Sequence, residues 1–574
     1  MNPSPPAPPA GGALLEPREP WPYFRWLLLA AVFGAVGALA AEAFRHALDG
    51  ATVWLFGGHQ DISVVMAQAS WQVQVLVPTA GGLVAGLVLL AANRYQQARK
   101  LSAGDYLETI DGRMGAIPVV PSLLRCLSSF FSILSGGSVG KEGAMVQLSS
   151  TVASVLAVRT RIRGEGLQMM IAVAATGGLA AVYHTPLAAA IFVAEIAFGG
   201  IEFRRLALLF TGAAASTAII MMMGLFTPMY PLALEAYYLD AATLGTTVLV
   251  GLAAALAGLL LLQAIRYARQ LFGHVPGGAP VRMALGGLLV GLLIVAAPEV
   301  AGNGFVPLAH LLRGDTLSTA LLALLVLKIA ATAATVGSGA VGGLFTPALL
   351  VGALTGMALT GAIAAAFGLH LDPALYAVVG MASALAATTQ APLMATLMAL
   401  ELTLEPVLIF PIMLATAIAY GTPHLLGQAG VYPVVDRHRL RYARRNQLYE
   451  MRAADAMRPL DAYVLDTATL AEAREMALQT RRRFVFVLDA GQAFIGAIRA
   501  HDLLSPPAGA RVLADLLDPD FPVVTAEQRL LDIWQVVVDS PAERLPVLAD
   551  LRDRKVLGVL PKSEVLQAAG RTLV

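Results

Sequence analysis

The sequence is poor in cysteine and in charge. A single cysteine, Cys126, excludes a disulfide framework and any metal site built from cysteine ligands. Charged residues make up 13% of the chain, against about 25% in soluble globular proteins. The net charge of +1 provides no basic surface for nucleic acid. These shortages exclude a soluble enzyme of ordinary composition, a disordered chain and a nucleic-acid-binding protein, and the scattered histidines predict no metal site.

Apolar residues take the place of the missing charge. They make up 57% of the 574 residues, with a mean hydropathy of +0.70. The charge is concentrated late in the chain, because residues 431–574 hold 39 of the 77 charged residues. We therefore predict a disordered, Pro-rich N-terminal tail over residues 1–21, a membrane domain over residues 22–445 and a soluble domain over residues 446–574.

Several apolar stretches are too short to cross a membrane as one helix. Spanning ~30 Å of hydrocarbon takes about 20 helical residues, and the stretches at about 122–135 and 143–157 hold fewer. Glycine, serine and proline interrupt others. Non-helical backbone survives at membrane depth only inside protein or beside a cavity. The pattern therefore predicts broken, re-entrant helices.

One sequence pattern occurs twice, with nine residues from proline to glutamate in each copy. The copies are Leu179-Ala180-Ala181 with Pro186-Leu187 and Glu195, and Leu385-Ala386-Ala387 with Pro392-Leu393 and Glu401. A glycine-rich segment precedes each copy, at residues 136–143 and 337–345. Coincidence in a chain rich in alanine and leucine is the alternative explanation. A true repeat predicts two halves whose interrupted helices meet at a central substrate site.

The first glycine-rich segment places opposite charges at the start of an apolar helix. Its last residues are Gly140, Lys141, Glu142 and Gly143, followed by Ala144. A carboxylate there is costly unless it faces water, an ion pathway or a partner. Helix N-termini attract anions, so the carboxylate of Glu142 can occupy an anion site and leave it on protonation. A structural ion pair that involves Lys141 and Glu142 is the alternative.

The second glycine-rich segment ends in a sequence suited to a helix start. Its residues are Gly342-Gly343-Leu344-Phe345-Thr346-Pro347. The glycines free the backbone, and Pro347 suits the first turn of a helix. The N–H groups of Leu344 and Phe345 would then point at a ligand, as in a backbone anion cradle. An ordinary junction between loop and helix is the alternative.

Together the two segments resemble the CLC family of chloride channels and proton/chloride exchangers. Glu142 lies in a sequence like the family's G[K/R]EG motif, with Ala144 where proline is usual, and Gly343–Pro347 matches its GxFxP motif. The resemblance covers about residues 22–445. It implies an all-α polytopic membrane domain with two inverted repeats and broken helices. It also implies a homodimer with one anion pathway in each subunit.

The resemblance assigns roles to single residues. Glu142 corresponds to the gating glutamate, while Leu344 and Phe345 correspond to the residues whose backbone N–H groups bind the central anion. Tyr432 is the best match to an anion-binding tyrosine, since its phenol O–H could donate to the same anion. An aromatic residue at the membrane interface is the alternative for Tyr432.

The family's filter serine has two candidate positions in this chain. Ser102 can be aligned with it, although the residues around Ser102 depart from the family's GSGIP sequence. A register anchored on Gly104 and Gly112 places Asp105 there instead. If Ser102 is the match, the chain resembles the chloride-selective members of the family.

The C-terminal part contains two similar αβ units. Each has two apolar strands, the second with a glycine, and an acidic residue at the following helix start, which is Asp502 in the first unit and Glu564 in the second. This pattern resembles a small α/β pair of CBS domains. In that family the aspartate can hold an adenosine ribose, so Asp502 is the candidate nucleotide site. The usual Thr or Ser is missing from both units, which favours a dimerising or regulatory module over a bound adenine nucleotide.

The position of a second acid separates exchangers from channels in this family. Exchangers usually have an inner, proton-relaying glutamate ten residues after the proline that matches Pro186, and Ile196 stands there. The main prediction is therefore a passive chloride channel of the voltage-gated type, gated by Glu142. A proton-coupled chloride exchanger is the first alternative, and a secondary transporter of another anion is the second. No catalytic constellation is present, so we do not expect an enzyme.

These interpretations also predict where the protein is located, what it transports and what it binds. We expect an integral protein of the cell (plasma or inner) membrane, with the N-terminus and the C-terminal tail in the cytoplasm. Chloride is the expected substrate, joined by protons in the exchanger. The expected partners are a second copy of the chain and the lipid bilayer, without nucleic acid and without a certain cofactor.

Overall fold

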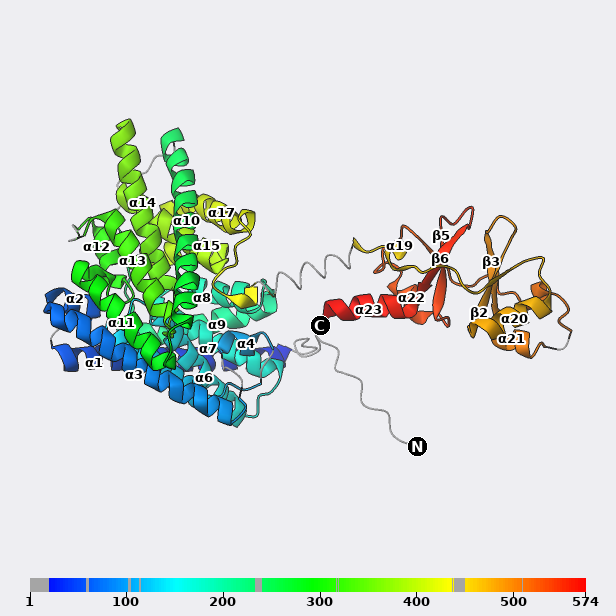
Figure 1. The fold of residues 1–574 in the computed structure, drawn as a ribbon, viewed down its shortest axis with the longest axis horizontal. Helices are drawn as coiled ribbons and strands as arrows, with labels where there is room; N and C mark the ends of the chain where they lie inside the picture. Colours follow the sequence, from blue (N-terminus) through cyan, green and yellow to red (C-terminus); the bar gives the residue numbers. More distant parts are fainter. Residues whose placement is uncertain are drawn as a thin grey trace. The chain divides into compact units, whose positions relative to one another are not determined.

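The computed structural model describes most of the chain as two separate units. The described residues are 20–57, 61–101, 105–112, 115–232, 240–315, 317, 319–435, 437, 450–507 and 509–573. The units comprise Met1–Asp436 and Arg437–Val574. Figure 1 shows the chain as a ribbon, and each unit is described by itself.

The first unit is built from helices. Eight of those described are long and apolar enough to cross a membrane. They are α1 (Pro20–Phe56), α3 (Trp71–Ala98), α7 (Glu165–Tyr183), α9 (Phe203–Met222), α10 (Ala241–Gly273), α11 (Gly278–Ala296), α14 (Phe345–Phe367) and η3 (Pro406–Leu408) continued by α17 (Ile409–Leu425). The expected polytopic membrane domain is confirmed.

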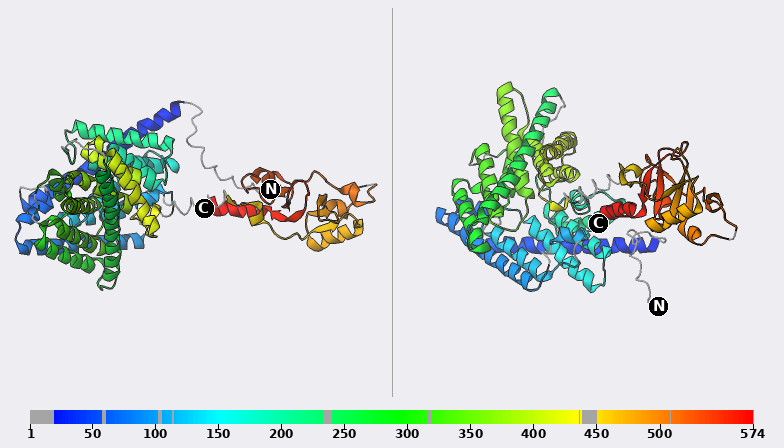
Figure 2. Two further views of the ribbon diagram at one scale, coloured as in Figure 1. Left: turned by 90° about the horizontal axis from the view of Figure 1, so that it is seen from above. Right: turned by 45° about the vertical axis from the view of Figure 1, so that its right-hand side comes forward.

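Shorter helices fill the space between the long ones. They are α2 (Ile62–Gln68), α4 (Tyr106–Ile110), α5 (Val119–Leu134), α6 (Glu142–Arg159), α8 (Pro186–Phe192), η1 (Val193–Ala197), η2 (Pro298–Val300), α12 (Phe305–Arg313), α13 (Leu321–Gly337), α15 (Pro373–Thr389) and α16 (Pro392–Thr403). Figure 2 shows the same helices from two further directions. Small residues bring many of them close: α14 and α15 cross where Gly352 meets Gly380, and a Cβ on either would overlap the other's carbonyl group.

The helices break where the repeated sequence pattern predicts. His184 ends α7 in the left-handed conformation, with φ of 56°, and Pro186 then begins α8. Gln390 ends α15 in the same way, with φ of 61°, and Pro392 begins α16. A proline in the first turn of a helix loses no hydrogen bond. The two copies therefore have the same local structure, which confirms the broken helices and the internal repeat.

The two copies also hold each other in place. The carboxylate of Glu195, at the end of the first copy, accepts a hydrogen bond of 2.9 Å from the N–H of Met394 at the start of α16. Glu401, at the end of the second copy, accepts one of 2.8 Å from the N–H of Ala188 at the start of α8. Each glutamate also accepts from the preceding backbone N–H. Each copy thus caps the other's positive helix end.

The second unit contains two sheets with the same topology. Their strands are β1 (Tyr463–Leu465), β2 (Phe484–Leu488) and β3 (Phe494–Arg499), and β4 (Val524–Thr525), β5 (Arg544–Leu548) and β6 (Val556–Pro561). In both sheets the first pair of strands is parallel and the second antiparallel. The helices are α19 (Ala453–Ala456), α20 (Leu470–Thr480), α21 (Ala500–Leu504), η4 (Leu513–Leu516), α22 (Trp534–Asp539) and α23 (Lys562–Leu573). The predicted pair of αβ units is confirmed.

Candidate anion site

Two helix starts from the two halves of the first unit meet at one point. Glu142 is the first residue of α6, and Phe345 is the first residue of α14. The loops before them are joined by two backbone hydrogen bonds. The N–H of Gly140 donates to the Gly343 carbonyl at 2.8 Å, and the N–H of Gly343 donates to the Gly140 carbonyl at 2.9 Å. Two positive helix ends are thereby brought to the same place inside the protein.

The carboxylate of Glu142 occupies the helix end of α14. Its Oε1 accepts a hydrogen bond of 2.9 Å from the backbone N–H of Phe345. Glu142 is only 2% exposed and Phe345 only 3%. The carboxylate is thus hydrogen-bonded to a backbone N–H of the other half, and the neighbouring Lys141 is the N-cap residue of α6. The carboxylate therefore lies at a helix end whose backbone N–H groups are suited to an anion.

Both motifs take the positions in their helices that the sequence predicts. Gly143 follows Glu142 as the second residue of α6, and Pro347 is the third residue of α14, where its missing N–H is not needed. Leu344 is the N-cap residue of α14. Of the two predicted backbone donors, Phe345 is the one whose N–H is hydrogen-bonded to Glu142.

Aromatic rings line the region around Phe345. The ring centroid of Tyr432 is 6.5 Å from that of Phe345 and 5.8 Å from that of Phe192. The Tyr183 ring lies 6.1 Å from Phe345, and its hydroxyl is hydrogen-bonded to Oγ1 of Thr346 at 2.9 Å. The structure therefore brings the predicted Tyr432 to the site. Sequence reasoning missed Tyr183, and its one local signal is its position at the end of a repeated helix.

The filter-serine position keeps its two candidates. Ser102 lies outside the described residues. Asp105 is the exposed N-cap residue of α4, and its carboxylate accepts a hydrogen bond of 2.9 Å from the N–H of Leu107. The next residue, Tyr106, donates its N–H to Oε1 of Gln147 on α6 at 3.1 Å. The residue after Asp105 is thus hydrogen-bonded to α6, the helix that begins at Glu142.

Ile196 is fully buried in η1, with 0% exposure. An isoleucine side chain has no atom that can bind a proton. The adjacent Glu195 uses its carboxylate oxygens to accept hydrogen bonds from the start of α16. The nearest acid in sequence is thus engaged in holding the repeats together.

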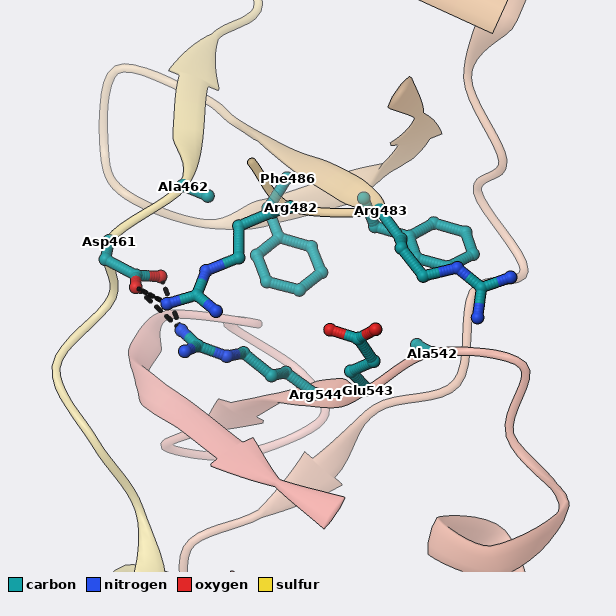
Figure 3. A pocket seen from close by; sticks show the side chains of 9 residues that line it. Asp461, Ala462, Arg482, Arg483, Phe486, Ala542, Glu543 and Arg544 are labelled. Atoms are coloured by element: carbon teal, nitrogen blue, oxygen red, sulfur yellow. Dashed lines mark hydrogen bonds and ion pairs between the residues drawn. The ribbon is translucent and has the colours of Figure 1, made fainter. Parts of the chain in front are cut away.

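A cleft in the second unit gathers charged side chains. It is lined by Asp461, Ala462, Arg482, Arg483, Phe484, Phe486, Ala542, Glu543 and Arg544. Figure 3 shows the guanidinium groups of Arg482 and Arg544 side by side next to the carboxylate of Asp461, to which they donate at 2.9 and 2.7 Å. Burial pushes the pKa of Asp461 up, but the hydrogen bonds from the two arginines outweigh it and leave the pKa below its usual value.

The residues of this cleft do not fit the predicted nucleotide contact. Asp502 lies on α21 and is not among the residues that line the cleft. Two of the three arginines are already paired with Asp461. A ribose contact through Asp502 stays a prediction from the resemblance.

The family model and the related sequences that match this chain belong to the same family. The family model described as voltage gated chloride channel matches residues 81–424. A ClcB-like chloride channel protein of Ralstonia nicotianae is 39% identical over 411 residues, which covers 71% of this chain and 95% of that protein. The voltage-gated ClC-type chloride channel ClcB of Salmonella typhimurium is 36% identical over 423 residues and covers 71% of this chain and 98% of its own length.

Comparison with solved structures gives the same fold. The crystal structure of a slow cyanobacterial Cl⁻/H⁺ antiporter matches with a TM-score of 0.63 at 21% identity, over 72% of this chain and 97% of that one. A eukaryotic CLC transporter matches with a TM-score of 0.58 at 17% identity, over 94% of this chain and 98% of that one. At these identities the likeness concerns the fold alone.

Proposed function

The chain belongs to the CLC family of chloride transport proteins, and from this premise we propose that it carries chloride across a membrane in exchange for protons. The observation that supports this most directly is the hydrogen bond from the N–H of Phe345 to the carboxylate of Glu142. Chloride and the carboxylate are both anions, so they compete for the same positive helix end. Protonation of Glu142 removes its charge and favours its departure.

Competition between the Glu142 carboxylate and chloride for one helix end can couple the flux of chloride to the flux of protons. Each return of the Glu142 carboxylate to the N–H of Phe345 expels a chloride ion, and each departure requires a proton or a competing anion. A cycle that alternates the two states moves chloride and protons in opposite directions. Solved structures with this fold are described as a chloride/proton and a fluoride/proton antiporter, which agrees with exchange.

Passive conduction is the second candidate. The buried Ile196 favours it, because no carboxylate stands where exchangers usually relay protons from the inner side. The names of the two relatives from Ralstonia nicotianae and Salmonella typhimurium, which call them chloride channels, agree with it. Exchange in this chain requires protons to reach Glu142 through water or through Glu195.

Chloride efflux from reconstituted liposomes separates the two candidates. The membrane potential is clamped at zero and the external pH is recorded during efflux. Exchange predicts a steady proton flux opposite to chloride at one ratio across several gradients, whereas passive conduction predicts no proton flux. The control is Glu142→Gln, which should retain chloride flux and lose proton flux. Absence of chloride flux from the wild-type protein would contradict both candidates.

The proposed assembly is a homodimer in the cell membrane, with the N-terminus and the second unit in the cytoplasm. The cluster Arg159–Arg163, which starts at the last residue of α6, supports a cytoplasmic location for the loop that follows by the positive-inside rule. Native mass spectrometry tests the dimer, and labelling of a single cysteine introduced in this loop tests the orientation. Replacing chloride by nitrate or fluoride in the efflux assay tests the selectivity that Ser102 would confer.

A further inference from the structure

A short connecting segment, residues 426–431, leads from the end of α17 to Tyr432. Gly427 in this segment has a left-handed φ of 62°, so the chain turns there. The N–H of Gln428 then donates to the Pro423 carbonyl at 2.9 Å, which ties the turn back to α17. The path of the connecting segment therefore decides where the chain delivers Tyr432.

Arg266 fastens the connecting segment to α10. Its guanidinium donates through one nitrogen to Oε1 of Gln428 at 2.9 Å and through another to the Ala429 carbonyl at 2.9 Å. Gln263, one turn earlier on α10, donates its side-chain amide to the same Oε1 at 2.5 Å. A guanidinium presents its donors in a rigid planar fork, so it can bind two neighbouring acceptors at once. Arg266 therefore fixes two consecutive residues of the connecting segment.

The end of α15 holds the same segment closer to the tyrosine. The N–H of Val431 donates to the Thr388 carbonyl at 2.8 Å. Ala429 precedes Tyr432 by three residues, and three residues span at most about 11 Å. Arg266 and the end of α15 are thus two anchors of one short segment, and Tyr432 comes directly after them.

Tyr432 is the residue through which this fastening can reach the anion site. Its ring packs against Phe192 and Phe345, with centroids 5.8 and 6.5 Å away. The N–H of Phe345 is the donor to the Glu142 carboxylate. A shift of the connecting segment therefore moves a ring that lies beside this donor.

We propose that Arg266 is a positioning residue for the anion site and acts through Tyr432. By holding the connecting segment, it keeps the Tyr432 ring against Phe345, where the phenol O–H can donate to chloride. The inference rests on the proposed chloride transport and on the anion-binding role predicted for Tyr432. Without the contacts of Arg266 the segment keeps its anchor at α15 alone, so the ring takes up more positions and the site binds chloride less tightly.

A fluorine label on the ring tests the positioning directly. With 3-fluorotyrosine in place of Tyr432, the full chain gives one ¹⁹F NMR signal that reports the surroundings of this ring. Arg266→Met removes the hydrogen-bond donors and keeps an unbranched side chain, and we expect it to shift or broaden the signal. Arg269→Met is the matched control, which should leave the signal unchanged. Arg269 is an exposed residue one turn further along α10, so its replacement removes the same charge from the same helix.

Chloride titration calorimetry tests the consequence for the site. Arg266→Met should lower the affinity for chloride about twofold or more, at the low end of the coupling between residues of one hydrogen-bond network. Arg266→Lys should fall between the wild type and Arg266→Met, because an amine keeps the charge but lacks the fork. Tyr432→Phe removes the O–H donor. In the Tyr432→Phe background, Arg266→Met should cause little further loss, since both changes remove the same contact.

Three results would overturn the proposal. An unchanged ¹⁹F signal in a folded Arg266→Met protein would show that Arg266 does not position the ring. A loss of affinity that is equally large in the Tyr432→Phe background would show that Arg266 acts elsewhere. An equal effect of Arg269→Met would show that the charge of α10 matters and the contact does not.

A second variant covers the case in which Arg266→Met folds poorly. Gln428→Met removes the side-chain acceptor from the other side of the contact and should also change the ¹⁹F signal, and an unchanged signal counts against the proposal. The NMR measurement needs no transport. An unmoved ring together with intact chloride flux would therefore refute the role of Arg266 alone, whereas a displaced ring without chloride flux in the wild type would refute the proposed function alone.

Discussion

The place that Glu142 occupies can be emptied without changing Glu142. A methyl group at Gly140 would overlap both oxygens and the carboxyl carbon of the Glu142 side chain. These atoms are the far end of a flexible side chain, so the carboxylate can move away while the backbone stays. Gly140 does not have a positive φ, so alanine fits its backbone conformation. We expect Gly140→Ala to displace the carboxylate and leave the N–H of Phe345 free.

The size of the effect follows from the lost hydrogen bond. The bond between Phe345 and Glu142 is 2.9 Å long and joins a backbone N–H to a carboxylate. Hydrogen bonds to charged groups contribute about 1.5–3 kcal/mol. With about 1.4 kcal/mol for each factor of ten, the occupancy of the site by the carboxylate should fall about 10- to 150-fold. Where carboxylate and chloride compete, the apparent affinity for chloride rises by up to the same factor.

Isothermal titration with chloride measures this change, and liposome efflux measures its consequence. Gly140→Ala should bind chloride more tightly and lose most of the pH dependence of its flux. Gly361→Ala is the matched control, because Gly361 lies on α14 itself and a Cβ there meets nothing within 4 Å. Wild-type affinity together with wild-type pH dependence in a folded Gly140→Ala would refute the competition between Glu142 and chloride.

Three further changes test other parts of the molecule. Glu142→Gln should keep or increase chloride flux and lose most of its pH dependence in the efflux assay; an unchanged pH profile would remove Glu142 from the gate. Lys328→Met should lower the Tm, because the buried amine donates to two backbone carbonyls that would be stranded at about 1–3 kcal/mol each; an unchanged Tm would mean that water replaces the amine. Asp461→Asn should destabilise the second unit by about 1 kcal/mol or less, since the side chain is 43% exposed. Because the folded-state pKa of Asp461 is lowered, its contribution to the free energy of unfolding is complete at neutral pH and is lost as the pH falls through that pKa, below 3.8. Hydrogen exchange in β2 and β5 between pH 3 and 7 should show this loss. An effect of the substitution that does not depend on pH would contradict the prediction.

Local signals made much of the fold predictable. Pro186 and Pro392 begin helices where the repeated pattern placed them, because proline fits the first turn of a helix and disrupts an interior one. The strand β2 (Phe484–Leu488) is one of the two apolar strands predicted for the first αβ unit. Its five residues are all apolar and include two valines and two phenylalanines. Residues of these types favour a buried β-strand. These features depend on near neighbours in the chain.

Long-range pairing was not predictable in the same way. The sequence motifs identify Glu142 and Phe345 as members of one site, but not that the N–H of Phe345 is the partner of the carboxylate. That contact depends on the bridge between Gly140 and Gly343, two residues that are far apart in the chain. The repeated glutamates were visible in the sequence, yet nothing local shows that Glu195 caps the other copy instead of its own helix.

The anion site depends on a difference between two halves that are otherwise alike. Each half supplies a glycine-rich loop, and the two loops are joined at equivalent positions, Gly140 and Gly343. Two residues later one half has Glu142 and the other has Phe345, each the first residue of its helix. If both positions carried a carboxylate, the two like charges would repel each other beside the same N–H groups, and one would have to bind a proton. If both carried phenylalanine, no group of the protein would compete with chloride. With one of each, the carboxylate of the first half occupies the helix end of the second half, and in the proposed mechanism it leaves that place to chloride or on binding a proton.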